Sequence, residues 1–116
     1  MQARLESVEE RDGKILIGYA GDTPAGYVVA TIEETGGIDS LNKFSTRRGS
    51  IDALFVYDEF RGKGVSSALI NTIEDFFRES GCQYSEVACL ASNDIAHEFY
   101  LKKGYQERYI NFLKEL

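Results

Sequence analysis

The run Arg61-Gly62-Lys63-Gly64-Val65-Ser66 brings two glycines, two cations and a hydroxyl to the junction between an apolar, strand-like segment and an amphipathic, helix-like one. Free N–H groups at the start of a helix bind anions, and glycines without Cβ atoms let a phosphate approach the backbone closely. Arg61 and Lys63 would add positive charge beside that phosphate, and Ser66 a hydroxyl donor. The pattern therefore indicates a pyrophosphate-binding turn, although an ordinary strand-to-helix turn would use the same glycines.

A second group of chemically capable residues lies on a helix predicted over residues 93–103. Asn93, Ala96 and Tyr100 are spaced i, i+3 and i+7, so an amide, a small side chain and a phenol share one helical face. A phenol has a pKa of ~10, so it holds at neutral pH a proton that it can donate. Tyr100 is thus a candidate general acid, the alternative being a tyrosine packed on a sheet. Asn93 could touch a ligand or only cap the helix.

Charge and nucleotide motifs narrow the possible ligands. The formal net charge of −6 and a pI near 4.8 disfavour a nucleic-acid partner, which needs a basic face. The same charge favours a cationic small molecule, although solubility alone would also explain it. Neither GxxxxGK[ST] nor GxGxxG occurs, so the P-loop and dinucleotide-binding motifs are excluded.

Metal, redox and membrane chemistry find no support in the sequence. Two cysteines without a CxxC pair and a single histidine, His97, predict no metal site. Cys89 could carry an acyl group, but a buried structural thiol is the commoner case. The first residues are polar, and no apolar run approaches the ~20 residues of a membrane span, so we expect a cytoplasmic protein without a membrane partner.

The elements that must position these residues follow from hydrophobic periodicity and turn residues. The 116 residues predict a single domain, 1–116, with a mixed, mostly antiparallel sheet and flanking helices, an α/β (α+β) fold. Residues 2–11 would form a short helix or a frayed arm, and residues 36–48 a polar loop. A helix should begin at Val65 and end at Gly81, before the helix over 93–103. Strands are predicted over residues 14–20, 25–33, 49–57, 85–91 and 105–113.

Two segments together resemble a known family. The run from Val56 to Ser66 is similar to the [QR]xxGx[GA] motif of the GCN5-related N-acetyltransferases (GNAT), with Ser66 in place of the usual Gly or Ala. Residues 93–105 are similar to the second signature of that family, NxxAxxFYxxxGF. The two signatures stand in the expected order and separation, and together they cover residues 51–105, about half of the chain.

The resemblance implies that acetyl-CoA is bound between two splayed parallel strands. Backbone groups of Phe55 and Val56 would pair with the pantetheine amides, and the N–H of Leu54 or Phe55 would polarise the thioester carbonyl. The run 61–66 would hold the pyrophosphate, while Asn93 and Ala96 would lie beside the cofactor. An amine acceptor would attack the thioester directly, and Tyr100 would protonate the leaving thiolate.

The general base is less well defined by the sequence. Asp52 lies in the predicted third strand, at a position where related enzymes often carry an acid, and it could act directly or through water. Glu33 and Glu34, at the end of the second predicted strand, are rivals. Each of these carboxylates could also be plain surface charge.

The family usually begins with a strand and one or two helices before this hairpin, whereas only about a dozen residues precede Lys14. The missing part normally forms one wall of the acceptor site, so the chain is expected to be a fragment or a naturally short form. An unpaired edge at residues 14–20 would invite a homodimer or would need to be covered. A non-catalytic acyl-CoA-binding or regulatory module is therefore the alternative to an enzyme, and a structural domain without ligand is a third possibility.

Overall fold

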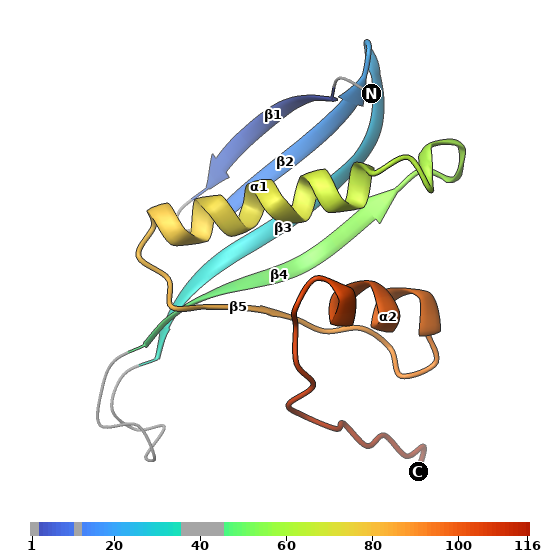
Figure 1. The fold of residues 1–116 in the computed structure, drawn as a ribbon. Coiled ribbons are helices and arrows are strands. Elements are labelled where there is room, and N and C mark those ends of the chain that lie inside the picture. The colour runs from blue at the N-terminus through green and yellow to red at the C-terminus, as the bar shows by residue number, and fades with distance from the viewer. Residues whose placement is uncertain (1–2, 11–12, 36–45) are drawn as a thin grey trace.

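The computed structural model describes residues 3–10, 13–35 and 46–116 (Figure 1). Its five-stranded sheet has the order β1-β2-β3-β4-β5, with antiparallel pairs except for the parallel pair β4–β5. This arrangement confirms the predicted mixed, mostly antiparallel sheet. The strands are β1 (Ala3–Glu10), β2 (Gly13–Ala20), β3 (Thr23–Thr35), β4 (Thr46–Val56) and β5 (Tyr84–Val87), and the helices are η1 (Asp58–Phe60), α1 (Val65–Glu79) and α2 (Asp94–Lys102).

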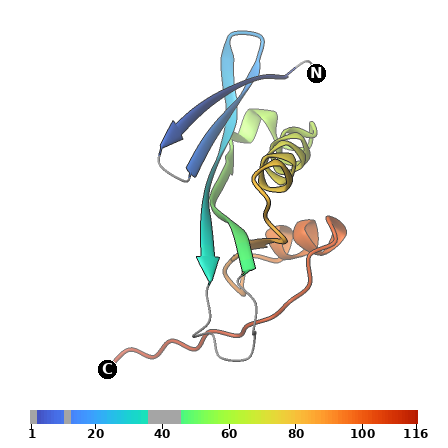
Figure 2. The same ribbon diagram turned by 90° about the vertical axis from the view of Figure 1, so that its left-hand side faces the viewer.

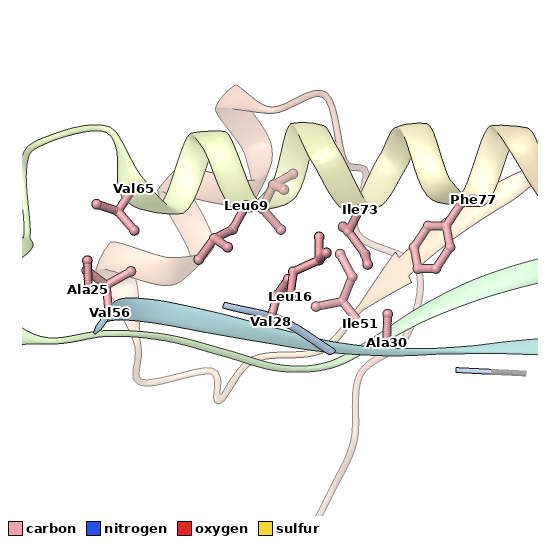
Figure 3. Packing of buried hydrophobic residues seen from close by; sticks show 11 residues of the cluster. Leu16, Ala25, Val28, Ala30, Ile51, Val56, Val65, Leu69, Ile73 and Phe77 are labelled. Carbon is pink, nitrogen blue, oxygen red and sulfur yellow. The ribbon is translucent and has the colours of Figure 1, made fainter. Parts of the chain in front are cut away.

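The core lies between α1 and one face of the sheet. Side chains at helical spacing on α1 point at alternate residues of the strands (Figure 3), which is the predicted amphipathic stripe. Phe77 packs directly over Gly49, where a Cβ atom would lie 2.3 Å from the ring, so only glycine fits under this ring. The buried cluster comprises Leu16, Ala25, Val28, Ala30, Ile51, Val56, Val65, Leu69, Ile70, Ile73 and Phe77.

Both α-helices lie on the same side of the sheet (Figures 1 and 2). Both also lack the length and apolar composition of a membrane-spanning helix. The opposite face of the sheet, within the described residues, carries no helix and exposes side chains such as Tyr27 and Phe55.

The N-terminal residues correct one prediction. Residues 2–11 were expected to form a helix or an arm, but Ala3–Glu10 forms β1 and pairs with β2 from Ala3↔Ala20 to Glu10↔Gly13. Pairing satisfies the backbone groups along the edge of β2, whereas a short isolated helix is marginal in water. The predicted unpaired edge at residues 14–20 is therefore wrong. Only residues 11 and 12 separate β1 from β2, which leaves no room for a helix between these strands.

Two other predictions change in the second half of the chain. Residues 46–48 belong to β4, so the predicted loop was too long, and its residues 36–45 lie outside the described part of the structure. Residues 105–113 form no strand. The edge strand on that side, β5, has only four residues, too few to pair a nine-residue segment. Tyr109, Ile110 and Phe112 are consequently at least 78% exposed.

Candidate active site

The parallel strands β4 and β5 separate halfway along β4. Their pairing runs from Arg48↔Tyr84 to Ile51↔Val87 and stops there, although β4 continues to Val56. The strand predicted over residues 85–91 is shorter for the same reason, because β5 leaves β4 after Val87. The backbone of residues 52–56 therefore has no β5 partner, and an extended ligand with amide groups could pair with it. Leu54, Phe55 and Val56, the predicted backbone contacts, all lie in this stretch.

One carbonyl of that stretch already has a partner. Arg61 Nε donates to the carbonyl oxygen of Val56 at 3.3 Å, and its Nη1 forms an ion pair with Asp58 at 3.1 Å. The guanidinium thus links the end of β4 to the turn that precedes α1. A ligand that pairs with the Val56 carbonyl would share or displace this hydrogen bond.

The turn between η1 and α1 has the geometry of an anion site. Gly62 and Gly64 have φ of +74° and +82°, which side chains with a Cβ rarely adopt. A Cβ on either glycine would meet nothing within 4 Å, so protein packing does not require these glycines and the space beside them is open. Gly64 is the N-cap of α1 and no side chain caps the helix there. The first N–H groups of α1 and its positive dipole end are available to an anion.

The side chains around this turn differ in burial and in charge. Val65 is buried in the core and can offer only its backbone N–H, whereas Ser66 is half-buried. Lys63 is exposed, with its ammonium 5.9 Å from the centre of the Phe60 ring. The net positive charge beside the glycines therefore comes from Lys63, since Asp58 offsets much of the charge of Arg61.

Tyr100 is half-buried on α2 at the border of the core. Its ring meets Phe99 at 5.3 Å and Tyr105 at 5.8 Å between centroids, both edge to face. Burial raises the pKa of Tyr100 above its ordinary value, and negative charge on Cys89 would raise it further. Cys89 follows the end of β5, so Tyr100 lies beside the segment that leaves β4. A phenol in this environment keeps its proton at neutral pH, as a general acid must.

Asn93 caps α2 in the structure. Its Oδ1 accepts a hydrogen bond from the N–H of Ala96 at 3.1 Å. Of the two roles that the sequence left open for Asn93, ligand contact and helix cap, the structure therefore shows the cap. Ala96, one turn before Tyr100, is half-buried and small. Contacts of Asn93 and Ala96 with a cofactor stay predictions.

Asp52 lies at a β-bulge of β4. Ala53 pairs with Val29 and Ile51 with Ala30, so Asp52 is the extra residue between them. Its two carboxylate oxygens accept hydrogen bonds from the hydroxyls of Thr31, at 2.9 Å, and Ser50, at 3.0 Å. These bonds hold the exposed carboxylate in one orientation against the sheet.

Asp52 and Tyr100 lie on opposite faces of the sheet, beside the gap that opens where β4 and β5 separate. Ala30 of β3 points into the core beneath α1, so its neighbour Thr31, the partner of Asp52, points to the opposite face. Tyr100, in contrast, packs against the cluster that α1 shares with the sheet. The structure does not bring the two side chains into contact, and a group that reaches both would have to lie in the gap between β4 and β5.

Three further residues that the sequence brought into question are Glu34, His97 and Cys89. Glu34 forms an ion pair with Arg47 at 2.6 Å, and Arg47 also donates to the carbonyl of Ser80, so this carboxylate serves structure. His97 pairs with Glu107 on the exposed surface. Cys89 is exposed, so the expectation of a buried thiol was wrong.

Two groups of residues near the site were not predicted from the sequence. The exposed rings of Tyr27 and Tyr57 flank Phe55 at 5.6 and 5.0 Å, on the face of the sheet that carries no helix. Period-two spacing of Phe55 and Tyr57 could have signalled a shared face. In the second group, Tyr105 is joined to Glu74 and Ser85 by hydrogen bonds, and no local sequence pattern predicts these contacts.

The structure thus combines a mixed sheet, whose parallel strands β4 and β5 separate, with a glycine turn at the uncapped start of α1. The chain belongs to the acetyltransferase (GNAT) family, whose model matches residues 1–105. This membership confirms the family and the fold that the two signatures predicted.

Relatives and solved structures agree with this membership. The chain is 30% identical over 95 residues to an uncharacterized N-acetyltransferase of Methanocaldococcus jannaschii, which covers 81% of this chain and 61% of that protein. It is 32% identical over 68 residues to an aminoalkylphosphonate N-acetyltransferase of Salmonella typhimurium, covering 59% of this chain and 44% of that one. The chain thus spans 44% to 61% of the length of these relatives.

The fold is similar to that of AAC(6')-Iy in complex with a bisubstrate analogue, CoA-S-monomethyl-acetylneamine. The TM-score is 0.74 at 22% identity, over 92% of this chain and 72% of that one. A mutant protein of Bacillus halodurans gives a TM-score of 0.84 at 17% identity, over 93% of this chain and 68% of that one. At these identities the likeness concerns the fold alone.

Proposed function

We propose that this protein transfers an acetyl group from acetyl-CoA to an amine. The observation that carries the proposal is the separation of β4 and β5 after Ile51↔Val87, next to the open turn at Gly62 and Gly64. The gap would take the pantetheine arm along residues 52–56, and the turn would take the pyrophosphate. The named activities of the N-acetyltransferase relatives support the same reaction class.

In the proposed reaction a neutral amine attacks the thioester carbonyl, the carbon–sulfur bond breaks, and the sulfur leaves as a thiolate. Tyr100 would supply the proton that this thiolate takes up. Its phenol is half-buried, and burial raises its pKa, so the proton is present at neutral pH. A backbone N–H of Leu54 or Phe55 would stabilise the oxyanion that forms on the carbonyl during attack.

Asp52 would accept the proton of the incoming ammonium, directly or through a water molecule. Its carboxylate is exposed and oriented by Thr31 and Ser50, on the face opposite to Tyr100. An acceptor that approaches from this face would also meet the rings of Tyr27 and Phe55. A carboxylate and aromatic faces suit a cationic amine, which the net charge of −6 would also attract.

Release of free thiol from acetyl-CoA tests the proposal. The chain would be incubated with acetyl-CoA and a panel of polyamines, amino acids, aminoglycosides, aminoalkylphosphonates and peptides. We expect thiol release above background hydrolysis with at least one amine, and mass spectrometry should find that amine heavier by one acetyl group. If the protein binds acetyl-CoA but no amine of the panel raises thiol release above background hydrolysis, the catalytic function is contradicted.

That outcome would favour a second function, a non-catalytic acyl-CoA-binding module. Two observations support it. Only residues 11 and 12 lie between β1 and β2, and the face that carries Asp52 has no helix over it in the described residues. An acceptor on this face would meet one wall only. Calorimetry that finds tight CoA binding without turnover would distinguish this module from the enzyme.

A further inference from the structure

The helix that carries Tyr100 is attached to the molecule differently from α1. Five side chains of α1 are buried in the core, among them Leu69 and Ile73. None of α2 is buried, and its Phe99 and Tyr100 only contact the border of the same cluster. Apolar packing therefore fixes α1 firmly and α2 much less, so polar links must hold α2 in place.

The strongest of these links is the hydroxyl of Tyr105, three residues after the end of α2. It donates a hydrogen bond to Glu74 Oε2 of α1 at 2.8 Å and lies 2.7 Å from Ser85 Oγ of β5. Because the phenol proton goes to the carboxylate, Ser85 is the donor in the second bond. One half-buried hydroxyl thus joins α1, β5 and the end of α2.

The surroundings of Tyr105 keep its hydroxyl protonated, so that it remains a hydrogen-bond donor. Burial raises the pKa of Tyr105 far above its ordinary value, and the Glu74 carboxylate raises it further, while the hydrogen bond from Ser85 lowers it. A second link, from Lys103 Nζ to Asn71 Oδ1 at 2.7 Å, is exposed to solvent. Water competes with that bond, so it constrains α2 less than the half-buried bonds of Tyr105 do.

Tyr105 is in turn coupled directly to Tyr100. Its backbone N–H donates to the carbonyl of Tyr100 at 3.0 Å, and the two rings meet edge to face with 5.8 Å between centroids. A displacement of Tyr105 would therefore displace Tyr100 through both its backbone and its ring.

We propose that Tyr105 is the positioning residue of this site: its hydroxyl, bonded to Glu74 and Ser85, fixes the end of α2 and so places the Tyr100 phenol for proton transfer. This inference rests on the proposed acid role of Tyr100. An aromatic ring alone would serve the packing at position 105, whereas the hydroxyl is needed only for the two hydrogen bonds. Tyr105→Phe removes those bonds and keeps the ring, and is therefore the appropriate variant.

The first measurement is kinetic. We expect Tyr105→Phe to lower kcat by about 10-fold or more, since small misplacements of a catalytic group are costly, and to leave KM for acetyl-CoA within about 2-fold. Tyr109→Phe also loses a phenol hydroxyl, but Tyr109 is 78% exposed, so this control should match the parent chain. Glu74→Gln keeps an acceptor for Tyr105 and should retain most of kcat, whereas Glu74→Ala should behave like Tyr105→Phe.

The second measurement does not depend on turnover. The titration of the Tyr100 ring would be followed by NMR in tyrosine-labelled protein and assigned with Tyr100→Phe. Loss of the Tyr105 bonds should let water reach Tyr100, so its pKa should fall toward the ordinary value. Negative charge on Cys89, after β5, raises the pKa of Tyr100, and Tyr100 in turn raises the pKa of Tyr105, after α2. The titration is therefore repeated in a Cys89→Ala background to remove the thiol.

A folded Tyr105→Phe protein with an unchanged Tyr100 titration and unchanged kcat would overturn the proposal, even if its thermal stability fell. If Tyr105→Phe did not fold, Glu74→Ala and Ser85→Ala would each test one of the two bonds by the same titration. A parent chain without acetyltransferase activity would refute the proposed function, while the titration would still decide whether Tyr105 positions Tyr100.

Discussion

Tyr100 combines an acid function with a half-buried ring, and this combination predicts a specific pH dependence. The acid works only while it is protonated, and burial raises its pKa above the ordinary ~10, so the alkaline limb of kcat should lie above pH ~10. Tyr100→Phe should lower kcat by about 100-fold or more and remove this limb. Steady-state rates at saturating acetyl-CoA, measured across neutral and alkaline pH, provide the test.

Tyr84→Phe is the matched control for this prediction, since Tyr84 is 55% exposed on β5 and its hydroxyl takes no part in the proposed reaction. Its profile should coincide with that of the parent chain. An alkaline limb that survives in Tyr100→Phe would assign the limb to another group and remove Tyr100 from the acid role.

The sequence located residues such as Asn93 and Tyr100 because their relation is local. Both lie on one helix, where the spacing alone decides which side chains share a face. The bonds of Tyr105 join it to residues 31 and 20 positions away, and they depend on how α1, β5 and α2 pack. The position of Asp52 was predictable only in part. Its strand could be predicted, but the bulge that turns it toward Thr31 depends on the pairing with β3.

Among the elements, α1 and the strands it covers depend on one close contact. A Cβ at Gly49 of β4 would lie 2.3–2.4 Å from three ring atoms of Phe77, so one of the two elements must move if it is added. Gly49→Ala should therefore destabilise the protein by about 1–3 kcal/mol through overpacking. Urea unfolding followed by circular dichroism would measure the change.

The partner substitution provides the control for that prediction. Phe77→Leu removes the ring and should relieve the clash, so adding Gly49→Ala to it should cost much less than adding it to the parent chain. Equal costs in both backgrounds would mean that the ring of Phe77 is not what requires glycine at position 49.

The elements that the sequence mispredicted are those whose structure depends on a neighbour. Residues 3–10 lack an alternating pattern and became β1 because the edge of β2 was available to pair. Residues 105–113 have strand-like composition but form no strand beside the short β5. Helix α1, in contrast, carries its signal in its own periodicity and ended as predicted before Gly81.

On the scale of the whole molecule, the proposed donor site joins β4, β5 and α1, which together hold most of the core. A ligand that binds only the native state stabilises it by about 2.7 kcal/mol at 100 times its Kd. For a domain of this size that corresponds to a rise in Tm on the order of 10 °C. We expect acetyl-CoA to produce such a shift in differential scanning fluorimetry, and free acetate to produce none.

A comparison of Gly64→Ala with Gly21→Ala distinguishes an effect on ligand binding at the start of α1 from the general strain of alanine at a positive φ. Both glycines have positive φ, +82° and +62°, and a Cβ on either meets nothing within 4 Å, so each substitution should cost about 1–2 kcal/mol of stability. Only Gly64→Ala adds a methyl group where the pyrophosphate would approach the backbone, because Gly21 lies in the turn between β2 and β3 and not at the start of α1. The shift with acetyl-CoA should therefore shrink or vanish in Gly64→Ala and persist in Gly21→Ala, and equal shifts in the two variants would move the phosphate site away from this turn.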